Sequence, residues 1–178
     1  DAPTMGGHAI RHAVARAGID ANAVEDVIMG CGMQQGTQSQ NVARLCALSA
    51  DLPVTTAGMT IDRQCSSGMM AIATASKSIM AGEHDILVAG GLESISLVQN
   101  EHANMYRVID KNLTAKHQHI YMPMLDTAEV VAKRYNVSRA DQDAYALQSQ
   151  QRTALAQDAG KYDDEIAPLA SSMGLMDR

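Results

Sequence analysis

The chain contains no phenylalanine and no tryptophan, and only five tyrosines among its 178 residues. A buried core therefore has to be built from aliphatic side chains and from the 12 methionines, whose flexible side chains fill irregular spaces. Hydrophobic residues still make up 46% of the chain and charged residues only 19%. This balance is typical of a globular protein and excludes an intrinsically disordered one.

Basic residues are few and scattered. The 14 lysines and arginines are outnumbered by 20 acidic residues, and the net charge is −6. Because no run of lysine or arginine is present, we expect no nucleic-acid partner. No apolar stretch approaches the length needed to span a bilayer, and no secretory signal opens the chain, so we expect no membrane association either.

Cysteine is rare as well, with only Cys31, Cys46 and Cys65 in the chain. No two of them form a Cys-x-x-Cys pair, and an odd number without framework spacing fits a reducing compartment. We therefore expect the cytoplasm, or an organelle matrix if the source is eukaryotic. Cys46 falls on an apolar helical face and Cys31 follows a predicted strand, so both are interpreted as structural.

Helical and strand patterns alternate along the first half of the chain. The predicted helices cover residues 7–17, 40–50 and 69–80, and the predicted strands cover residues 26–31, 54–61 and 85–89. Helices that alternate with short apolar strands predict an α/β fold, in which helices pack on the faces of a sheet.

The pattern changes after residue 96. Residues 97–124 are polar and weakly periodic. This segment is too long to serve only as a connection in a compact domain, and long loops of this kind often bind a substrate or a partner subunit. Two predicted helices follow at residues 126–135 and 139–159, the second with Ser138 and Asp141 as a capping pair. We therefore divide the chain into a core at 1–96, a loop segment at 97–124, and a helical part with a tail at 125–178.

Cys65 is the residue with the strongest chemical signal. It lies between the predicted strand at 54–61 and the predicted helix at 69–80. At such a junction, the positive end of the helix dipole and free backbone N–H groups favour the thiolate, which is the nucleophilic form of cysteine. The same N–H groups can hold an oxyanion after attack on a carbonyl. The position therefore suits acyl transfer through a thioester.

Four blocks, in the same order, resemble the thiolase family. Residues 64–68, Gln-Cys-Ser-Ser-Gly, resemble its nucleophile motif, and residues 90–94, Gly-Gly-Leu-Glu-Ser, resemble the turn after a strand. Residues 124–129 resemble its Thr-Ala-Glu loop and helix start, and residues 138–150 resemble the helix that follows. Each block alone is moderately specific, but their order across most of the chain makes chance similarity very improbable.

The resemblance implies a thiolase-like α/β fold, with a mixed β-sheet covered by helices and part of an inserted loop domain. It implies that Cys65 is the acyl-thioester nucleophile, with its backbone N–H in an oxyanion hole, and that Met124 lines the acyl pocket. Coenzyme A and acyl-CoA would be substrates, with no metal and no tightly bound cofactor. The family forms dimers or tetramers, so a homodimer or homotetramer is implied, with the strand before Cys65 as a subunit contact.

Thiolases either cleave 3-oxoacyl-CoA or condense two acetyl-CoA molecules to acetoacetyl-CoA, reactions of fatty acid and lipid metabolism. Two departures from the family pattern are visible here. Asp62 stands where the family usually has asparagine, and Leu125-Asp126 replaces a Gly-x pair after Met124. Because that asparagine is mainly structural, its replacement does not exclude activity.

The family's Gly-His-Pro motif, whose histidine activates the nucleophile, and its second catalytic cysteine in Cys-x-Gly do not occur here. The match therefore indicates the N-terminal half only, and we expect these 178 residues alone to be inactive, because a nucleophile without its base loses most of its power. The alternative is a catalytically silent, truncated thiolase-like module that binds acyl-CoA or a partner. A decarboxylating condensing enzyme is a further possibility, which the second and third blocks disfavour.

Two features near the second block have competing interpretations. Glu93 is either a general base or, as we prefer, a structural residue that holds its turn beside the nucleophile through hydrogen bonds. Gly90 and Gly91 are expected to allow close backbone approach to the Cys65 loop rather than to cradle a phosphate, because no phosphate-binding glycine motif is present.

The remaining polar candidates are weaker. Arg63 either raises the thiolate fraction of its neighbour or forms a salt bridge across a subunit interface. Ser66 and Ser67 are expected to bind backbone donors rather than act as nucleophiles. His117 and His119 form a His-x-His pair, but a metal site would need further ligands at defined spacing, so we expect a solvated loop.

Overall fold

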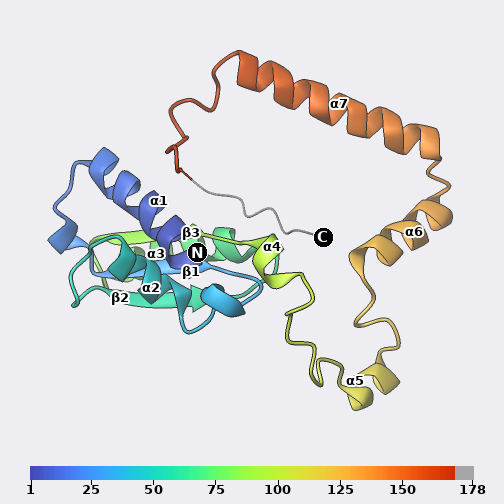
Figure 1. Ribbon diagram of the computed structural model, residues 1–178, viewed down its shortest axis with the longest axis horizontal. Coiled ribbons are helices and arrows are strands. Elements are labelled where there is room, and N and C mark those ends of the chain that lie inside the picture. The colour runs from blue at the N-terminus through green and yellow to red at the C-terminus, as the bar shows by residue number, and fades with distance from the viewer. Residues whose placement is uncertain (171–178) are drawn as a thin grey trace. The chain divides into compact units, whose positions relative to one another are not determined.

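The computed structural model of the protein describes residues 1–170 (Figure 1). The chain divides into two compact units, which are described separately. The first spans Asp1–Asn104 and includes the described residues from Ala167 onward, and the second spans Met105–Ile166. The end of the predicted 125–178 segment, after residue 170, lies outside the described residues.

The first unit contains three strands, four α-helices and two short 3₁₀ turns in its described part. In chain order they are α1 Ala2–Ala17, η1 Ala21–Ala23, β1 Asp26–Gly30, η2 Gly36–Gln38, α2 Val42–Ser49, β2 Ala57–Ile61, α3 Ser67–Met80, β3 Leu87–Gly91 and α4 Ile95–Val98.

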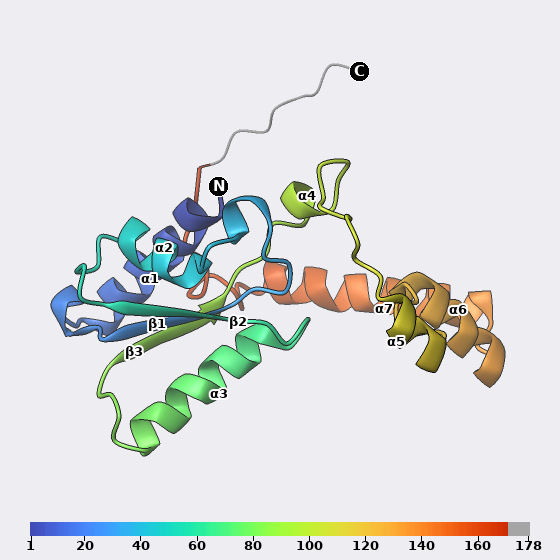
Figure 2. The ribbon, with the colours of Figure 1, turned by 90° about the horizontal axis from the view of Figure 1, so that it is seen from below.

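The strands form one sheet in the order β2-β1-β3, and both pairings are parallel. Helices α1 and α2 lie on one face of this sheet and α3 lies on the other (Figure 2). The predicted α/β class is confirmed, but the sheet is parallel in these strands rather than mixed. The cause is that a helix separates each pair of consecutive strands, and such crossovers return the chain in the same direction.

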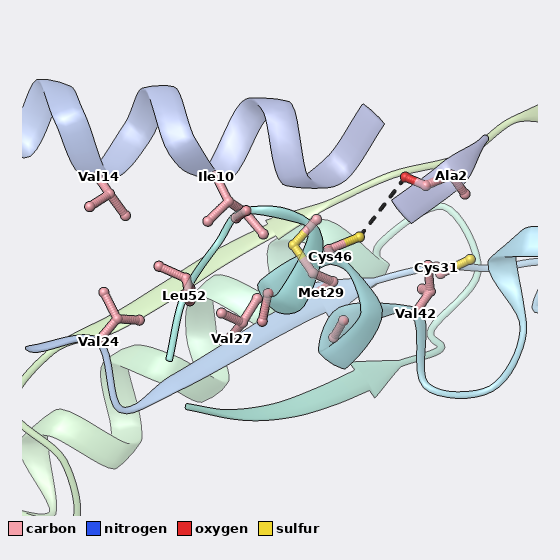
Figure 3. Packing of buried hydrophobic residues seen from close by; sticks show 13 residues of the cluster. Ala2, Ile10, Val14, Val24, Val27, Met29, Cys31, Val42, Cys46 and Leu52 are labelled. Atoms are coloured by element: carbon pink, nitrogen blue, oxygen red, sulfur yellow. Dashed lines mark hydrogen bonds between the residues drawn. The ribbon is translucent and has the colours of Figure 1, made fainter. Parts of the chain in front are cut away.

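The central strand β1 is buried on both faces, as expected for a strand between two helical layers. Val27 and Met29 point toward α1 and α2, where Ile10 and Val14 of α1 close the cluster from above (Figure 3). Cys46 of α2 is fully buried in the same cluster, and its thiol donates to the Ala2 carbonyl at 4.0 Å (Figure 3). This layer is packed without any aromatic ring.

The opposite face carries a smaller cluster, in which Ile28 of β1 packs against Ala71 and Ala75 of α3. Because both helix residues are alanines, no long side chain holds the α3 backbone away from the sheet. The approach is closest at the start of the helix. A Cβ atom on Gly30 would collide with the backbone of Ser67 and Gly68.

Helix α1 begins at Ala2, five residues before the predicted start, with Pro3 in its first turn. The predicted start was too late because Gly6 and Gly7 have a low helix propensity. In the folded chain both glycines are buried against α2. A Cβ on Gly7 would lie 2.7 Å from the Ser49 hydroxyl oxygen. Close helix packing therefore explains the two glycines.

Three other elements, α2, β2 and β3, start later than predicted, and β3 begins at Leu87 instead of residue 85. Helix α2 begins at Val42 because Gln40 and Asn41 both adopt left-handed backbone angles, each with φ of 57°. Strand β2 begins at Ala57, since the preceding residues form a turn in which the Thr56 N–H donates to the Pro53 carbonyl at 3.0 Å. Neither turn carries the glycine that usually marks such conformations.

The second unit is helical in its described part, with α5 Lys111–Lys116, α6 Met124–Tyr135 and α7 Arg139–Asp158. The two predicted helices are confirmed, and Ser138 and Asp141 form the predicted capping box. Helix α5 was not predicted, because six residues are too few for a periodic signal. The Asp110 side chain caps it by accepting from the N–H groups of Asn112 and Leu113.

The close approach of α3 to β1 leads to a first prediction. Replacing Gly30 with alanine should lower the free energy of unfolding by about 1–3 kcal/mol, because the added methyl meets backbone that cannot rotate away. Gly68→Ala is the matched control, since a Cβ there meets no atom within 4 Å outside its own helix. It should raise stability by at most about 0.5 kcal/mol, because Gly68 is the second residue of α3 and not in the middle of the helix, where replacing glycine gains most. Urea unfolding measures both, and equal effects would contradict the assigned contact.

The buried thiols lead to a second prediction. Burial raises the pKa of Cys46 from 9.0 to about 11, with a smaller contribution from Cys31. An unfolded thiol ionises near pH 9, so the stability that this group contributes is complete below pH 9 and is lost as the pH rises toward 11. The loss should amount to at most about 2–3 kcal/mol.

Cys46→Ala should therefore flatten the decline of the unfolding free energy over this range, although it lowers stability at every pH by leaving a small void. All other titratable groups are the same in both proteins, so the difference between the two slopes isolates the Cys46 thiol. Identical slopes would show that Cys46 is not protected from ionisation by the core.

Candidate active site

The site lies at the carboxyl edge of the parallel sheet. Gly30, at the end of β1, is in register with Ile61 of β2 on one side and with Gly91 of β3 on the other. The segments that follow these three residues therefore leave the sheet side by side. Such edges are where open α/β sheets bind their ligands.

Cys65 lies in the short segment between Ile61 and the start of α3 at Ser67. Its thiol is free and exposed, in contrast to the buried thiols of Cys31 and Cys46. It precedes the first turn of a 14-residue helix, whose N-terminus carries the partial positive charge of the helix dipole. The strand-to-helix junction predicted for Cys65 is thus present.

A cavity of about 470 Å³ opens beside this residue. Its walls come from the segments after all three strands and from the first turn of α3. The lining residues are Gly30, Gly32, Met33, Gln64, Cys65, Ser67, Gly68, Gly91, Leu92, Glu93, Ile95 and Gln99. Four glycines among them leave backbone, rather than side chains, along much of the wall.

Gly91 brings the end of β3 close to this wall. A Cβ on Gly91 would lie 3.1 Å from the Gly30 carbonyl oxygen and 3.3 Å from the Gly68 Cα. The predicted close approach is therefore confirmed for Gly91. The prediction was wrong for Gly90, whose Cβ would make only ordinary contact, at 3.6 Å, with the Met29 sulfur.

Glu93 connects the segments after β1 and β3. Its carboxylate accepts hydrogen bonds from the Gly32 N–H at 2.8 Å and from the Gln38 side-chain amide at 2.5 Å. The Cys31 thiol donates to the same carboxylate at 3.8 Å. These bonds confirm the structural role expected for Glu93.

Gln38 is the member of this network that the sequence analysis missed. Its side chain is fully buried, and its amide also donates to the Met33 carbonyl at 2.7 Å while its oxygen accepts from the Ser94 N–H. A buried amide with all these partners fixes the segments that it joins. A single glutamine in a polar stretch offers no pattern by which it could have been recognised.

Cys31 is held in the same wall but is not suited to be a nucleophile. Burial, followed by the negative charge of Glu93, raises the pKa of its thiol to about 11. It therefore stays protonated near neutral pH, as its structural interpretation requires.

The two serines after Cys65 differ. The Ser67 hydroxyl accepts from the Arg63 N–H and donates to the Gln64 carbonyl, so its predicted backbone role is confirmed. The Ser66 side chain makes no capping hydrogen bond, and the prediction was wrong there. The Arg63 guanidinium points to the Met70 sulfur at 3.3 Å, and its proposed interface salt bridge stays a prediction.

Other predicted residues belong to the second unit. Met124 is the first residue of α6 and is exposed, and its place in an acyl pocket stays a prediction.

Among residues 1–170, no group of three or more acidic, histidine or cysteine side chains is arranged to hold a metal ion. No helix in that same range is both long enough and apolar enough to cross a membrane.

Comparison with known proteins identifies a family model and relatives that match most of the chain. Residues 1–174 match the family model described as the N-terminal domain of thiolase. The chain is 41% identical over 166 residues to a beta-ketoadipyl-CoA thiolase of Pseudomonas aeruginosa, a match that covers 85% of this chain and 41% of the relative.

Two further relatives show the same relationship. A 3-ketoacyl-CoA thiolase of Bacillus subtilis is 41% identical over 167 residues, covering 93% of this chain and 42% of the relative. A mitochondrial acetyl-CoA acetyltransferase of Mus musculus is 39% identical over 182 residues, covering 97% of this chain and 42% of the relative. The chain thus spans less than half the length of these curated relatives. It belongs to the thiolase family, whose N-terminal domain it matches almost throughout.

Proposed function

We propose that the protein is a thiolase-type acyltransferase in which Cys65 carries the acyl group between CoA thioesters. One observation carries the proposal: an exposed, free thiol stands at the start of α3, beside a cavity at the carboxyl edge of a parallel sheet. The buried Cys31 and Cys46 offer no competing nucleophile, because burial raises the pKa of each to about 11.

In the proposed reaction, the Cys65 thiolate attacks the carbonyl carbon of an acyl thioester. A new C–S bond forms, the bond between the acyl carbon and the CoA sulfur breaks, and CoA leaves as its thiolate. The negative oxygen that develops during attack lies near the backbone of Cys65 and the first turn of α3, where N–H groups and the helix dipole stabilise it. With a 3-oxoacyl-CoA, attack falls on the 3-oxo carbonyl and expels the enolate of acetyl-CoA, which then takes up a proton. The sulfur of a second CoA then attacks the acyl carbon on Cys65, the bond between that carbon and the Cys65 sulfur breaks, and the Cys65 thiolate is released.

Both 3-oxoacyl-CoA thiolysis and acetyl-CoA condensation are compatible with this chemistry, and the relatives named above carry names of both kinds. We propose CoA and acyl-CoA as substrates, without a tightly bound cofactor. Residues 97–124 would contact CoA, substrate or a second subunit, and Met124 would line the acyl pocket. The whole protein would act as a homodimer or homotetramer in a reducing compartment, the cytoplasm or an organelle matrix.

The proposal is tested on the whole protein, because these 178 residues alone are expected to be inactive. The purified protein is acid-quenched after brief exposure to acetyl-CoA, and its peptides are mapped by mass spectrometry. One acetyl group should appear on the peptide that contains Cys65, and hydroxylamine should remove it, as expected of a thioester. Cys65→Ser should lose the label by a factor on the order of 10² or more, because a serine hydroxyl is not ionised near neutral pH and has no base of its own here.

Cys31 and Cys46 serve as internal controls, since both should stay unlabelled in the folded protein. Absence of acetyl on Cys65, while acyl-CoA still binds, would overturn the proposal and leave a module that binds acyl-CoA without turnover. Acetyl on other residues at the same level as on Cys65 would show non-specific chemistry and would contradict it equally.

A further inference from the structure

The residue before Cys65 has an uncommon backbone conformation. Gln64 has a φ of 49°, in the left-handed region that residues with a side chain seldom adopt outside turns. Such a conformation persists only where surrounding contacts hold it, and it is frequent at functional sites. The contacts that hold Gln64 in this conformation therefore also set the direction in which the chain presents Cys65.

The side chain of Asp62 holds one end of the Gln64 residue. Its Oδ1 accepts a hydrogen bond from the Gln64 N–H at 2.8 Å. This bond to the backbone two residues further on is the turn that aspartate and asparagine form with their short side chains. A carboxylate acceptor makes the bond stronger than a neutral one would.

The side chain of Ser67 holds the other end. Its hydroxyl donates to the Gln64 carbonyl at 2.6 Å and accepts from the Arg63 N–H at 2.8 Å. The Ser67 N–H also donates to the Gln64 carbonyl, at 3.0 Å. Ser67 is only 4% exposed, so these bonds are shielded from competing water.

Gly32, whose N–H donates to the Glu93 carboxylate at 2.8 Å, lies beside this turn. A Cβ on Gly32 would lie 3.3 Å from the Glu93 carboxylate and 3.6 Å from the Gln64 carbonyl oxygen. The segment that Glu93 binds is therefore a neighbour of the Gln64 turn.

We propose that Asp62 and Ser67 are positioning residues, which lock Gln64 in its left-handed conformation and so keep Cys65 at the N-terminal end of α3. This inference rests on the proposed role of Cys65 as nucleophile. Neither residue touches the reacting atoms. Each acts through the Gln64 peptide groups. Loss of either bond lets Gln64 relax and changes the direction in which the chain presents the Cys65 thiol at the start of α3.

The test compares alkylation of Cys65 by iodoacetamide near neutral pH in the purified protein and in four variants. Asp62→Ala and Ser67→Ala should each slow Cys65 alkylation about two- to fivefold, because the thiol is then no longer held in one direction at the start of α3, and electrostatic effects at a helix N-terminus are of this size. Asp62→Asn keeps an oxygen acceptor on the same short side chain, although a neutral and weaker one, and should restore most of the rate of the unsubstituted protein. Ser66→Ala is the matched control, because the neighbouring hydroxyl makes no capping bond.

Unfolding is detected in the same samples. Cys31 and Cys46 are 1% and 0% exposed, so they become alkylated only if the fold opens. Slower alkylation of Cys65 without alkylation of Cys31 and Cys46, together with a restored rate in Asp62→Asn, supports the positioning role. Unchanged Cys65 rates in Asp62→Ala and Ser67→Ala overturn it. An equal loss in Asp62→Asn and Asp62→Ala, or in Ser66→Ala and Ser67→Ala, overturns it as well.

If a variant exposes the buried thiols, the comparison is repeated at lower temperature, where opening is suppressed, and the same outcomes apply. Acetylation by acetyl-CoA is followed in parallel to separate the two proposals. Cys65 that is alkylated normally but never acetylated would overturn the proposed function and leave the positioning test intact. Cys65 that is acetylated normally in Asp62→Ala and Ser67→Ala would overturn the positioning role alone.

Discussion

The contact on which the site depends is the close approach of the first turn of α3 to the ends of β1 and β3. Gly30 and Gly91 permit it, because a Cβ on either would press on the backbone around Gly68 or on the neighbouring strand. Further along α3 the residues that face the sheet are the alanines Ala71 and Ala75, so the helix stays close to β1 there too. The two buried clusters on either side of the sheet contain no aromatic residue, so small and aliphatic side chains alone separate these layers.

From this contact follow the position and surroundings of Cys65. The segment after β2 has to turn sharply to enter α3, and the left-handed Gln64 makes that turn. Glu93 and the buried Gln38 then tie the segments after β1 and β3 together, so that the wall opposite the thiol is fixed too. The cavity is therefore formed by backbone and by a satisfied polar network, which together pre-organise it for a substrate.

The sequence predicted the alternation of strands and helices, the junction at Cys65 and the structural role of Glu93, because each has a local pattern. It missed the helix start at Ala2, since Gly6 and Gly7 act against an isolated helix and are explained only by their packing on α2. It also missed the roles of Gly30 and Gln38, whose partners lie far away in the chain. Features that arise from tertiary contacts leave no mark in local propensity or hydrophobic period, so the sequence could not predict them.

The most direct test of the account is the alkylation rate of Cys65 in Gly91→Ala against Gly90→Ala. The two glycines are adjacent in β3, but only a Cβ on Gly91 would press on Gly68 and the Gly30 carbonyl, while one on Gly90 makes ordinary contact with Met29. If the glycine contact places the nucleophile, Gly91→Ala changes the Cys65 rate severalfold and Gly90→Ala leaves it unchanged, with Cys31 and Cys46 unreactive in both. Equal rates in the two variants would contradict the account.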